Sequence, residues 1–146
     1  MLIAKKITAK DAIIFIILQI LGAGLGVMIA HGMFELDILQ ISSKSRQGAS
    51  QGFSEIIATF GLILVIFGGL KLRADAIPAL VGFYITSAYW FTASTSFANP
   101  AVTLARSLSD TFAGINPSNI IMFISCQFIG MLVALILVKY IFSEKE

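Results

Sequence analysis

Four long segments free of Lys, Arg and Asp constrain this chain more than any other feature. Each reaches or approaches the ~20 apolar residues with which a helix crosses a bilayer, and only Glu55 places a charge inside one of them. The segments are Ala12–Ala30, Gly52–Leu70, Ala76–Ala93 and Ile120–Val138. The chain of 146 residues is 58% hydrophobic and 12% charged, outside the soluble globular range. The sequence therefore predicts an all-α membrane protein with four transmembrane helices.

The remaining composition excludes several function classes. The single cysteine, Cys126, lies inside an apolar segment, so we expect neither a disulfide framework nor a thiolate metal cluster. The net charge of +2 is too small to indicate nucleic acid binding. We expect no catalytic residue, no cofactor and no metal ion. The lipid bilayer is the first partner that the composition indicates.

Basic residues gather on one side of the predicted membrane. That side holds both termini and the short link 71–75, with Lys5, Lys6, Lys10, Lys71, Arg73, Lys139 and Lys145. The opposite side holds the loop 32–51, with Lys44 and Arg46, and further along the chain Arg106. Cytoplasmic loops are enriched in Lys and Arg. We therefore expect both termini and the 71–75 link in the cytoplasm, with His31 as a polar residue at the opposite interface.

A short helix is predicted between the third and fourth apolar segments. Pro100 suits the first turn of a helix, and Asn99 before it is a good N-cap. Continued to about Asp110, this helix is only ~15 Å long, half of a ~30 Å bilayer core. Its irregular lead-in, Thr95–Ala98, is tolerated at membrane depth only inside protein or beside a water-filled cavity. The pattern predicts a helix that enters the membrane and turns back beside a pore.

Asn99-Pro100-Ala101 in this setting resembles the second Asn-Pro-Ala signature of the aquaporins, or major intrinsic proteins. Residues 55–60, Glu-Ile-Ile-Ala-Thr-Phe, resemble the start of the fourth span of that family. The resemblance covers nearly the whole chain. It implies a partial aquaporin fold in one transmembrane domain, residues 1–146, with spans three to six and one re-entrant half-helix.

An internal repeat is consistent with this resemblance. A shift of 108 positions pairs Phe15, Gln19 and Gly22 with Phe123, Gln127 and Gly130. Residues 1–34 are then the closing span of a first repeat, and residues 52–142 are a complete second repeat. The Asn that would precede Gln19 falls upstream of Met1. We therefore expect this to be about two thirds of an aquaporin, with the missing N-terminal half of the channel as a partner.

The resemblance also implies a function and a set of pore residues. It implies a passive channel for water and small uncharged solutes, assembled as a homotetramer in the bacterial inner membrane. In such a channel the Asn99 amide donates to the passing molecule, and the carbonyls of Ser96, Phe97 and Ala98 accept. The narrow filter corresponds to Ser87, Ser96 and Val102.

Val102 departs from the family pattern, because most members have an arginine there. A wider, less polar filter follows, and arsenous acid or glycerol becomes a plausible solute. Glu55 is implied to be structural, its carboxylate accepting bonds from the backbone before Asn99. Arg106, four residues after Val102, either supplies a charge to the outer vestibule or extends to the interface.

Two other readings of the sequence stay open at this point. One is a four-span proton-coupled exporter of the small multidrug type, with Glu55 as its proton site. Such exporters have no re-entrant helix and usually carry the carboxylate in the first span. The other is a fragment that does not conduct. If the chain is instead part of a channel, we expect that residues 1–146 alone do not conduct.

Overall fold

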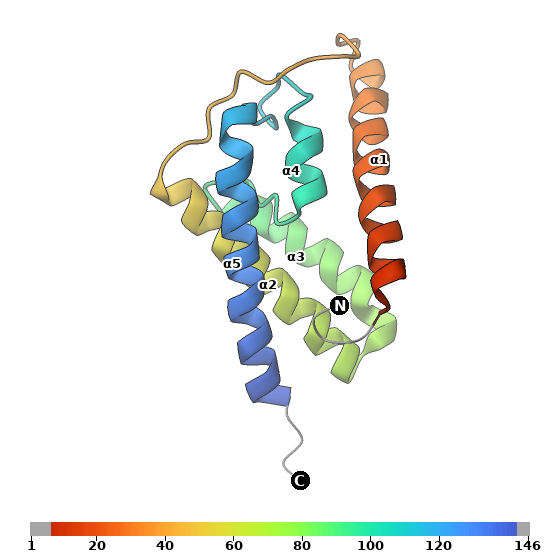
Figure 1. Ribbon diagram of the computed structural model, residues 1–146, viewed down its shortest axis with the longest axis vertical. Helices are drawn as coiled ribbons and strands as arrows, with labels where there is room; N and C mark the ends of the chain where they lie inside the picture. The colour runs from red at the N-terminus through yellow and green to blue at the C-terminus, as the bar shows by residue number, and fades with distance from the viewer. Residues whose placement is uncertain (1–6, 143–146) are drawn as a thin grey trace. The chain divides into compact units, whose positions relative to one another are not determined.

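The structure is a computed structural model that describes residues 7–142 (Figure 1). It divides into two compact units. Among the described residues, unit 1 comprises residues 7–46 and 100–120, and unit 2 comprises residues 47–99 and 121–142. Lys5, Lys6 and Lys145, which entered the topology prediction, lie outside the described residues. The predicted boundaries of the two repeats, at residues 34 and 52, stay a prediction.

Unit 1 is built on helix α1, Ala9–Met33, with the short helix α4, Pro100–Arg106, beside it (Figure 1). α1 begins after Thr8, whose hydroxyl oxygen accepts a hydrogen bond from the Asp11 N–H at 3.1 Å. It ends where the Leu36 N–H donates back to the His31 carbonyl at 2.9 Å. This closure places Glu35 at φ 56°, a conformation that usually takes glycine.

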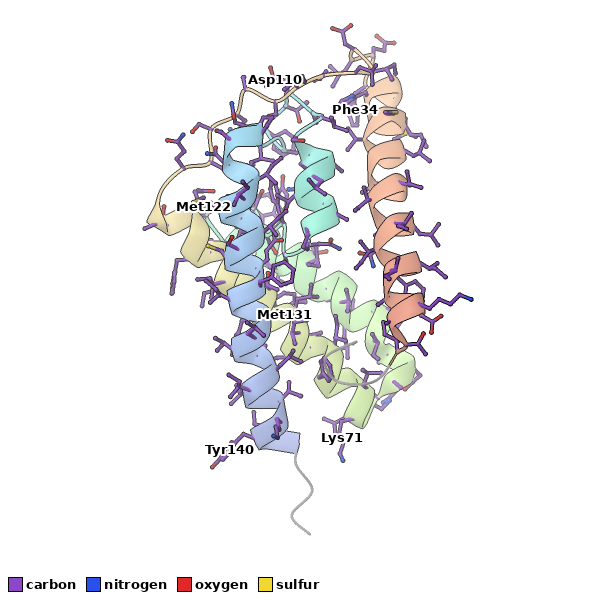
Figure 2. All side chains as sticks on the ribbon, in the orientation of Figure 1. Phe34, Lys71, Asp110, Met122, Met131 and Tyr140 are labelled. Carbon is purple, nitrogen blue, oxygen red and sulfur yellow. The ribbon has the colours of Figure 1, made fainter. Side chains whose placement is uncertain are left out.

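The three helices of unit 2 are α2, Ala49–Leu72, α3, Ile77–Phe91, and α5, Ile120–Phe142, which enters unit 2 at Ile121. They are arranged around α2, which packs against α3 and contacts α5 (Figure 1). Glycines allow the close approach of these helices. A side chain at Gly61 would collide with the Tyr84 hydroxyl of α3, and one at Gly130 would collide with the Ile56 backbone of α2. Figure 2 shows Lys71 and Tyr140, near the ends of α2 and α5, at the same end of this unit.

The all-α prediction is confirmed, and the described residues include three helices long and apolar enough to cross a membrane. These are Ala9–Met33, Ala49–Leu72 and Pro117–Ile141, with hydropathies of 2.6, 2.1 and 2.6. The predicted span 76–93 is shorter, because α3 has only 15 residues, or ~22 Å. It ends at Phe91 because Thr92 is extended, with ψ 139°. The 3₁₀ turn Ala74–Ala76 directly precedes it.

The helix after Asn99 also ends earlier than predicted, at Arg106 instead of near Asp110. The chain tightens there, since Ser107 and Leu108 donate to carbonyls three residues back, at 3.2 and 3.0 Å. The Asp110 N–H then bonds to the Gln40 side chain at 2.8 Å, outside any helix. The helix is therefore ~10 Å long.

Candidate functional site

The candidate site is the irregular segment 92–99, which connects α3 to the Asn99-Pro100-Ala101 motif. Three of its residues, Thr95, Ser96 and Ala98, have φ angles of 61°, 46° and 49°. Non-glycine residues rarely adopt this left-handed conformation, because each costs of order 1–3 kcal/mol and persists only where the surrounding structure enforces it. Such strain clusters at functional sites. The irregular lead-in predicted over Thr95–Ala98 is therefore present.

The Glu55 carboxylate, on α2, holds this segment in place. Its Oε1 accepts from the Ser94 hydroxyl at 2.5 Å and from the Phe97 N–H at 2.9 Å. Its Oε2 accepts from the Ala98 N–H at 2.9 Å and from the Gln127 amide at 2.7 Å. Glu55 is 0% exposed, so these four donors replace the water that a buried carboxylate loses.

The contacts with Glu55 also fix the direction of two backbone carbonyls. In a planar trans peptide the N–H and the C=O point in opposite directions. The N–H groups of Phe97 and Ala98 point at the Glu55 carboxylate. The carbonyl oxygens of Ser96 and Phe97, which belong to the same two peptides, therefore point away from it.

Further contacts to α2 and α5 extend this support. The Ser54 hydroxyl oxygen accepts from the Ala93 N–H at 3.1 Å, and the Gln51 amide donates to the Ala93 carbonyl at 3.0 Å. The Phe97 ring meets the Phe123 ring edge-on, with centroids 5.1 Å apart. Sequence reasoning missed Gln51, Ser54 and the role of Gln127. For Gln127 a signal existed, because it is one of the residues that the internal repeat pairs.

The predicted pore residues occupy different environments. Asn99 is half-buried at the end of the segment, and Pro100 and Ala101 begin α4, with Ala101 buried. Ser96 is buried, and its hydroxyl has no hydrogen-bond partner among the described residues. The roles predicted for these residues stay predictions.

The other two filter candidates lie on helices. Val102 is half-buried on α4. Ser87 is exposed on α3, and its hydroxyl donates to the Phe83 carbonyl one turn earlier at 2.9 Å. The assignment of Ser87 and Val102 to a filter stays a prediction.

Unit 1 contains a second cluster, which sequence reasoning missed. Arg46 was expected to be one of the loop cations, yet it is only 5% exposed. Its Nε donates to the Gly114 carbonyl at 2.7 Å and its Nη2 to the Phe112 carbonyl at 2.9 Å. Its backbone N–H donates to the Asn119 side chain at 2.9 Å. The guanidinium thus fixes the loop that follows α4.

His31 belongs to the same unit and is buried, at 2% exposure, whereas the sequence indicated an interfacial position. Its Nδ1 lies 3.1 Å from the Ile38 carbonyl oxygen, and its Nε2 lies 3.0 Å from the Ser109 hydroxyl. The imidazole therefore joins the end of α1 to both loops of unit 1. Arg106, the last residue of α4, lines a cavity next to it.

Three exposed ionisable groups outside the apolar helices, Arg73, Asp75 and Asp110, have local partners. The Arg73 guanidinium, 3.0 Å from Asp75, holds the pKa of that carboxyl below its ordinary value, and Asp75 raises the pKa of Arg73. In unit 1 the Asp110 carboxylate accepts from the Ser43 N–H at 2.8 Å and from its hydroxyl at 2.9 Å. These two donors hold the pKa of Asp110 below its ordinary value.

This chain belongs to the aquaporin (major intrinsic protein) family, because it is similar over most of its length to a member of that family. The chain is accordingly a multi-pass membrane protein. It is 45% identical, over 139 residues, to aquaglyceroporin AqpS of Rhizobium meliloti (strain 1021). The match covers 95% of this chain but only 60% of that relative.

Two other comparisons give no relative. No family model matches the chain, and no solved structure gives a significant match. The match to the aquaglyceroporin confirms the predicted family and the predicted partial fold.

Proposed function

We propose that this chain forms part of a passive membrane channel for water and small uncharged solutes, and that it is not an enzyme. The observation that carries the proposal is the strained segment that Glu55 holds directly before Asn99. A chain adopts left-handed residues in a buried segment only where something enforces them. In this segment the left-handed residues turn the carbonyls of Ser96 and Phe97 away from Glu55. The similarity to an aquaglyceroporin supports the proposal that these carbonyls face a passing water or small solute molecule.

In this channel the Asn99 amide and the carbonyls of Ser96, Phe97 and Ala98 exchange hydrogen bonds with the solute. The partial positive charge at the start of α4 disfavours cations and protons, while neutral molecules pass. Ser87, Ser96 and Val102 form the filter. Because Val102 brings neither a fixed charge nor a strong donor, the filter admits glycerol and arsenous acid as well as water.

The channel is completed by further polypeptide that corresponds to the part of AqpS not matched here. The complete assembly is a homotetramer in a bacterial inner membrane, with the 71–75 link on the cytoplasmic side. Lys71 and Arg73 in that link support this orientation. Residues 1–146 alone are expected not to conduct.

The structure argues against the coupled exporter. A proton-carrying carboxylate must exchange its proton with solvent. Glu55 is fully buried and accepts from four donors, including two backbone N–H groups. Protonation would break part of this set, and with it the conformation of the segment before Asn99.

The test is a chimera in which residues 1–146 replace the matching part of AqpS, reconstituted in vesicles. Stopped-flow light scattering reports water and glycerol permeability, and arsenite uptake is measured separately. Val102→Arg should suppress glycerol and arsenite passage about tenfold or more while water passage falls less. Leu104→Arg adds the same charge two positions away, on another face of α4, and should leave all three unchanged.

If the Val102→Arg chimera passes glycerol and arsenite as fast as the unsubstituted chimera, Val102 does not line the constriction. A chimera no more permeable than protein-free vesicles, although folded and inserted, would contradict the channel function. Vesicles that hold residues 1–146 alone form the third arm. Water permeability there well above protein-free vesicles would contradict the need for further polypeptide.

A further inference from the structure

At the C-terminal end of α1, unit 1 has polar side chains inside and apolar side chains outside. Met33, Phe34 and Phe112 are 70%, 74% and 71% exposed, and we call these three residues the apolar cluster. His31 and Ser109, at the same end, are only 2% and 8% exposed. A surface in contact with water usually shows the opposite distribution. Exposed apolar patches of this kind mark contact with a membrane or with a partner.

The charges at the two ends of α1 set the depth of this helix in a bilayer. The first acidic residue of the helix is Asp11, and the next along the chain is Glu35, just past the helix end. Residues 12–34 contain no Lys, Arg, Asp or Glu, and as a helix they extend over ~34 Å. A bilayer core is ~30 Å thick, so the uncharged run exceeds it only slightly. Met33 and Phe34 therefore lie at the boundary between the acyl chains and the headgroups.

Side-chain contacts hold the loop after α4 at the same level. The His31 Nε2 lies 3.0 Å from the Ser109 hydroxyl, and this hydroxyl lies 3.0 Å from that of Thr111. Phe112 follows Thr111 directly, and its side chain lines the same cavity as Phe34 and His31. The exposed Phe112 ring is therefore fixed near the Phe34 ring, although it belongs to a loop and not to a membrane-length helix.

The loop after α4 has a polar and an apolar side chain close together. The Phe112 carbonyl accepts from the buried Arg46 guanidinium at 2.9 Å, so the backbone is fixed while the ring is exposed. Asp110, two residues earlier, is exposed and accepts from the Ser43 N–H. Figure 2 shows Phe34 and Asp110 together at this end of unit 1. A carboxylate prefers water, and an aromatic ring is stable at the boundary of headgroups and acyl chains, so this loop suits a bilayer surface.

We propose that the rings of Phe112 and Phe34 insert into the lipid at the boundary of headgroups and acyl chains, so that the loop after α4 lies on the bilayer surface. The partner is lipid because the apolar cluster continues an exposed apolar face of α1. On that face Leu25, Ile29 and Met33 follow one another at four-residue spacing, and all three are exposed. The proposal requires membrane insertion of α1, but it goes beyond the channel function and is independent of conduction.

The test is depth-dependent fluorescence quenching on the full chain, reconstituted in phosphatidylcholine vesicles. Trp90→Phe removes the single native tryptophan, and Phe112→Trp then places one in the loop. Lipids brominated near the headgroup should quench this tryptophan at least about twofold more strongly than lipids brominated near the chain end. Leu25→Trp, two turns deeper than Met33 on α1, should show the reverse order. Lys44→Trp, at an exposed polar position of unit 1, is the matched control, and aqueous acrylamide should quench it about fivefold more strongly than Phe112→Trp.

Nuclear Overhauser effects between lipid acyl protons and the Phe112 ring of the unsubstituted chain decide the question if Phe112→Trp does not fold. Acrylamide quenching of Phe112→Trp as strong as that of Lys44→Trp would place the loop in water and overturn the proposal. Protection of Phe112→Trp from both kinds of quencher would show that protein, such as a second copy of the chain, covers the ring, and would overturn it too. A Leu25→Trp chain that no brominated lipid quenches would contradict the insertion of α1 on which the proposal depends.

Discussion

Both units contain an irregular segment held by one buried charged side chain, but the charge is opposite. In unit 2 the segment 92–99 leaves N–H groups without a helical partner, and the Glu55 carboxylate accepts from them. In unit 1 the loop 107–116 leaves carbonyls, and the Arg46 guanidinium donates to those of Phe112 and Gly114. The kind of unsatisfied backbone group, N–H or carbonyl, thus decides the sign of the charge on the side chain that stabilises it.

The comparison also separates strain from simple anchoring. The segment that Glu55 holds has three left-handed non-glycine residues, whereas no residue of the 107–116 loop has a positive φ. Glu55 therefore maintains a conformation that the segment does not prefer. Arg46 fixes a loop whose local backbone is unstrained.

The largest effect is expected at Glu55. Glu55→Ala leaves the Phe97 and Ala98 N–H groups buried without an acceptor, and removing one partner from a buried charged set costs about 3–5 kcal/mol. The measurement is the free energy of unfolding in mixed micelles. Glu35→Ala, at an exposed glutamate of unit 1, is the control. A loss below about 1 kcal/mol would mean that the segment does not depend on the carboxylate.

Arg46 should come next. Arg46→Met keeps the length of the side chain but strands the Phe112 and Gly114 carbonyls, at a cost of about 2–3 kcal/mol. Arg46→Lys should recover only part, since an ammonium lacks the planar fork. Lys44→Met, two residues away and exposed, should be neutral in the same unfolding measurement. Equal stability of Arg46→Met and the wild type would show that Arg46 does not stabilise the loop 107–116.

Sequence reasoning recovered unit 2 better than unit 1, for a physical reason. A carboxylate inside an apolar span is costly, so Glu55 is conspicuous in the sequence. Arg46 stands in a loop of polar residues, where an exposed cation is the ordinary expectation, and its burial depends on carbonyls some 66 to 68 positions later. His31 was missed in the same way, since Ser109 is 78 positions away. Local patterns also could not predict the ends of α3 and α4, which depend on Thr92 and on the Gln40 contact to Asp110.

A smaller effect is expected at Asp110 in unit 1, where the hydrogen bonds from Ser43 depend on pH. The Ser43 donors lower the pKa of Asp110 from its ordinary 3.8, so their bonds contribute above that value. They are lost as the pH falls through the lower pKa of the folded chain. The ¹⁵N shift of the Ser43 amide should report a transition below pH 3.8, and Asp110→Asn should abolish it. A transition at or above the ordinary pKa would show that Ser43 does not bind the carboxylate.

The smallest expected effect is a gain in stability, on substitution of Glu35. Glu35 closes α1 with φ 56°, and glycine adopts this conformation without the steric cost of a Cβ atom. Glu35→Gly should therefore stabilise unit 1 by about 0.5–1 kcal/mol. Glu35→Ala removes the charge but keeps the Cβ atom, and it should not stabilise. The unfolding midpoint distinguishes the two, and a loss of stability in Glu35→Gly would argue against the left-handed closure.

Amide hydrogen exchange at Phe97 and Ala98 tests the central claim, that Glu55 holds the segment before Asn99, most directly. In the wild type both amides should be protected although they lie outside any helix. Glu55→Gln should accelerate their exchange about 100-fold, the equivalent of about 2.7 kcal/mol. The Ser42 amide, bonded to Ser107 in unit 1 at 2.8 Å, should keep its rate. Unprotected Phe97 and Ala98 amides in the wild type, or rates unchanged by Glu55→Gln, would contradict the account.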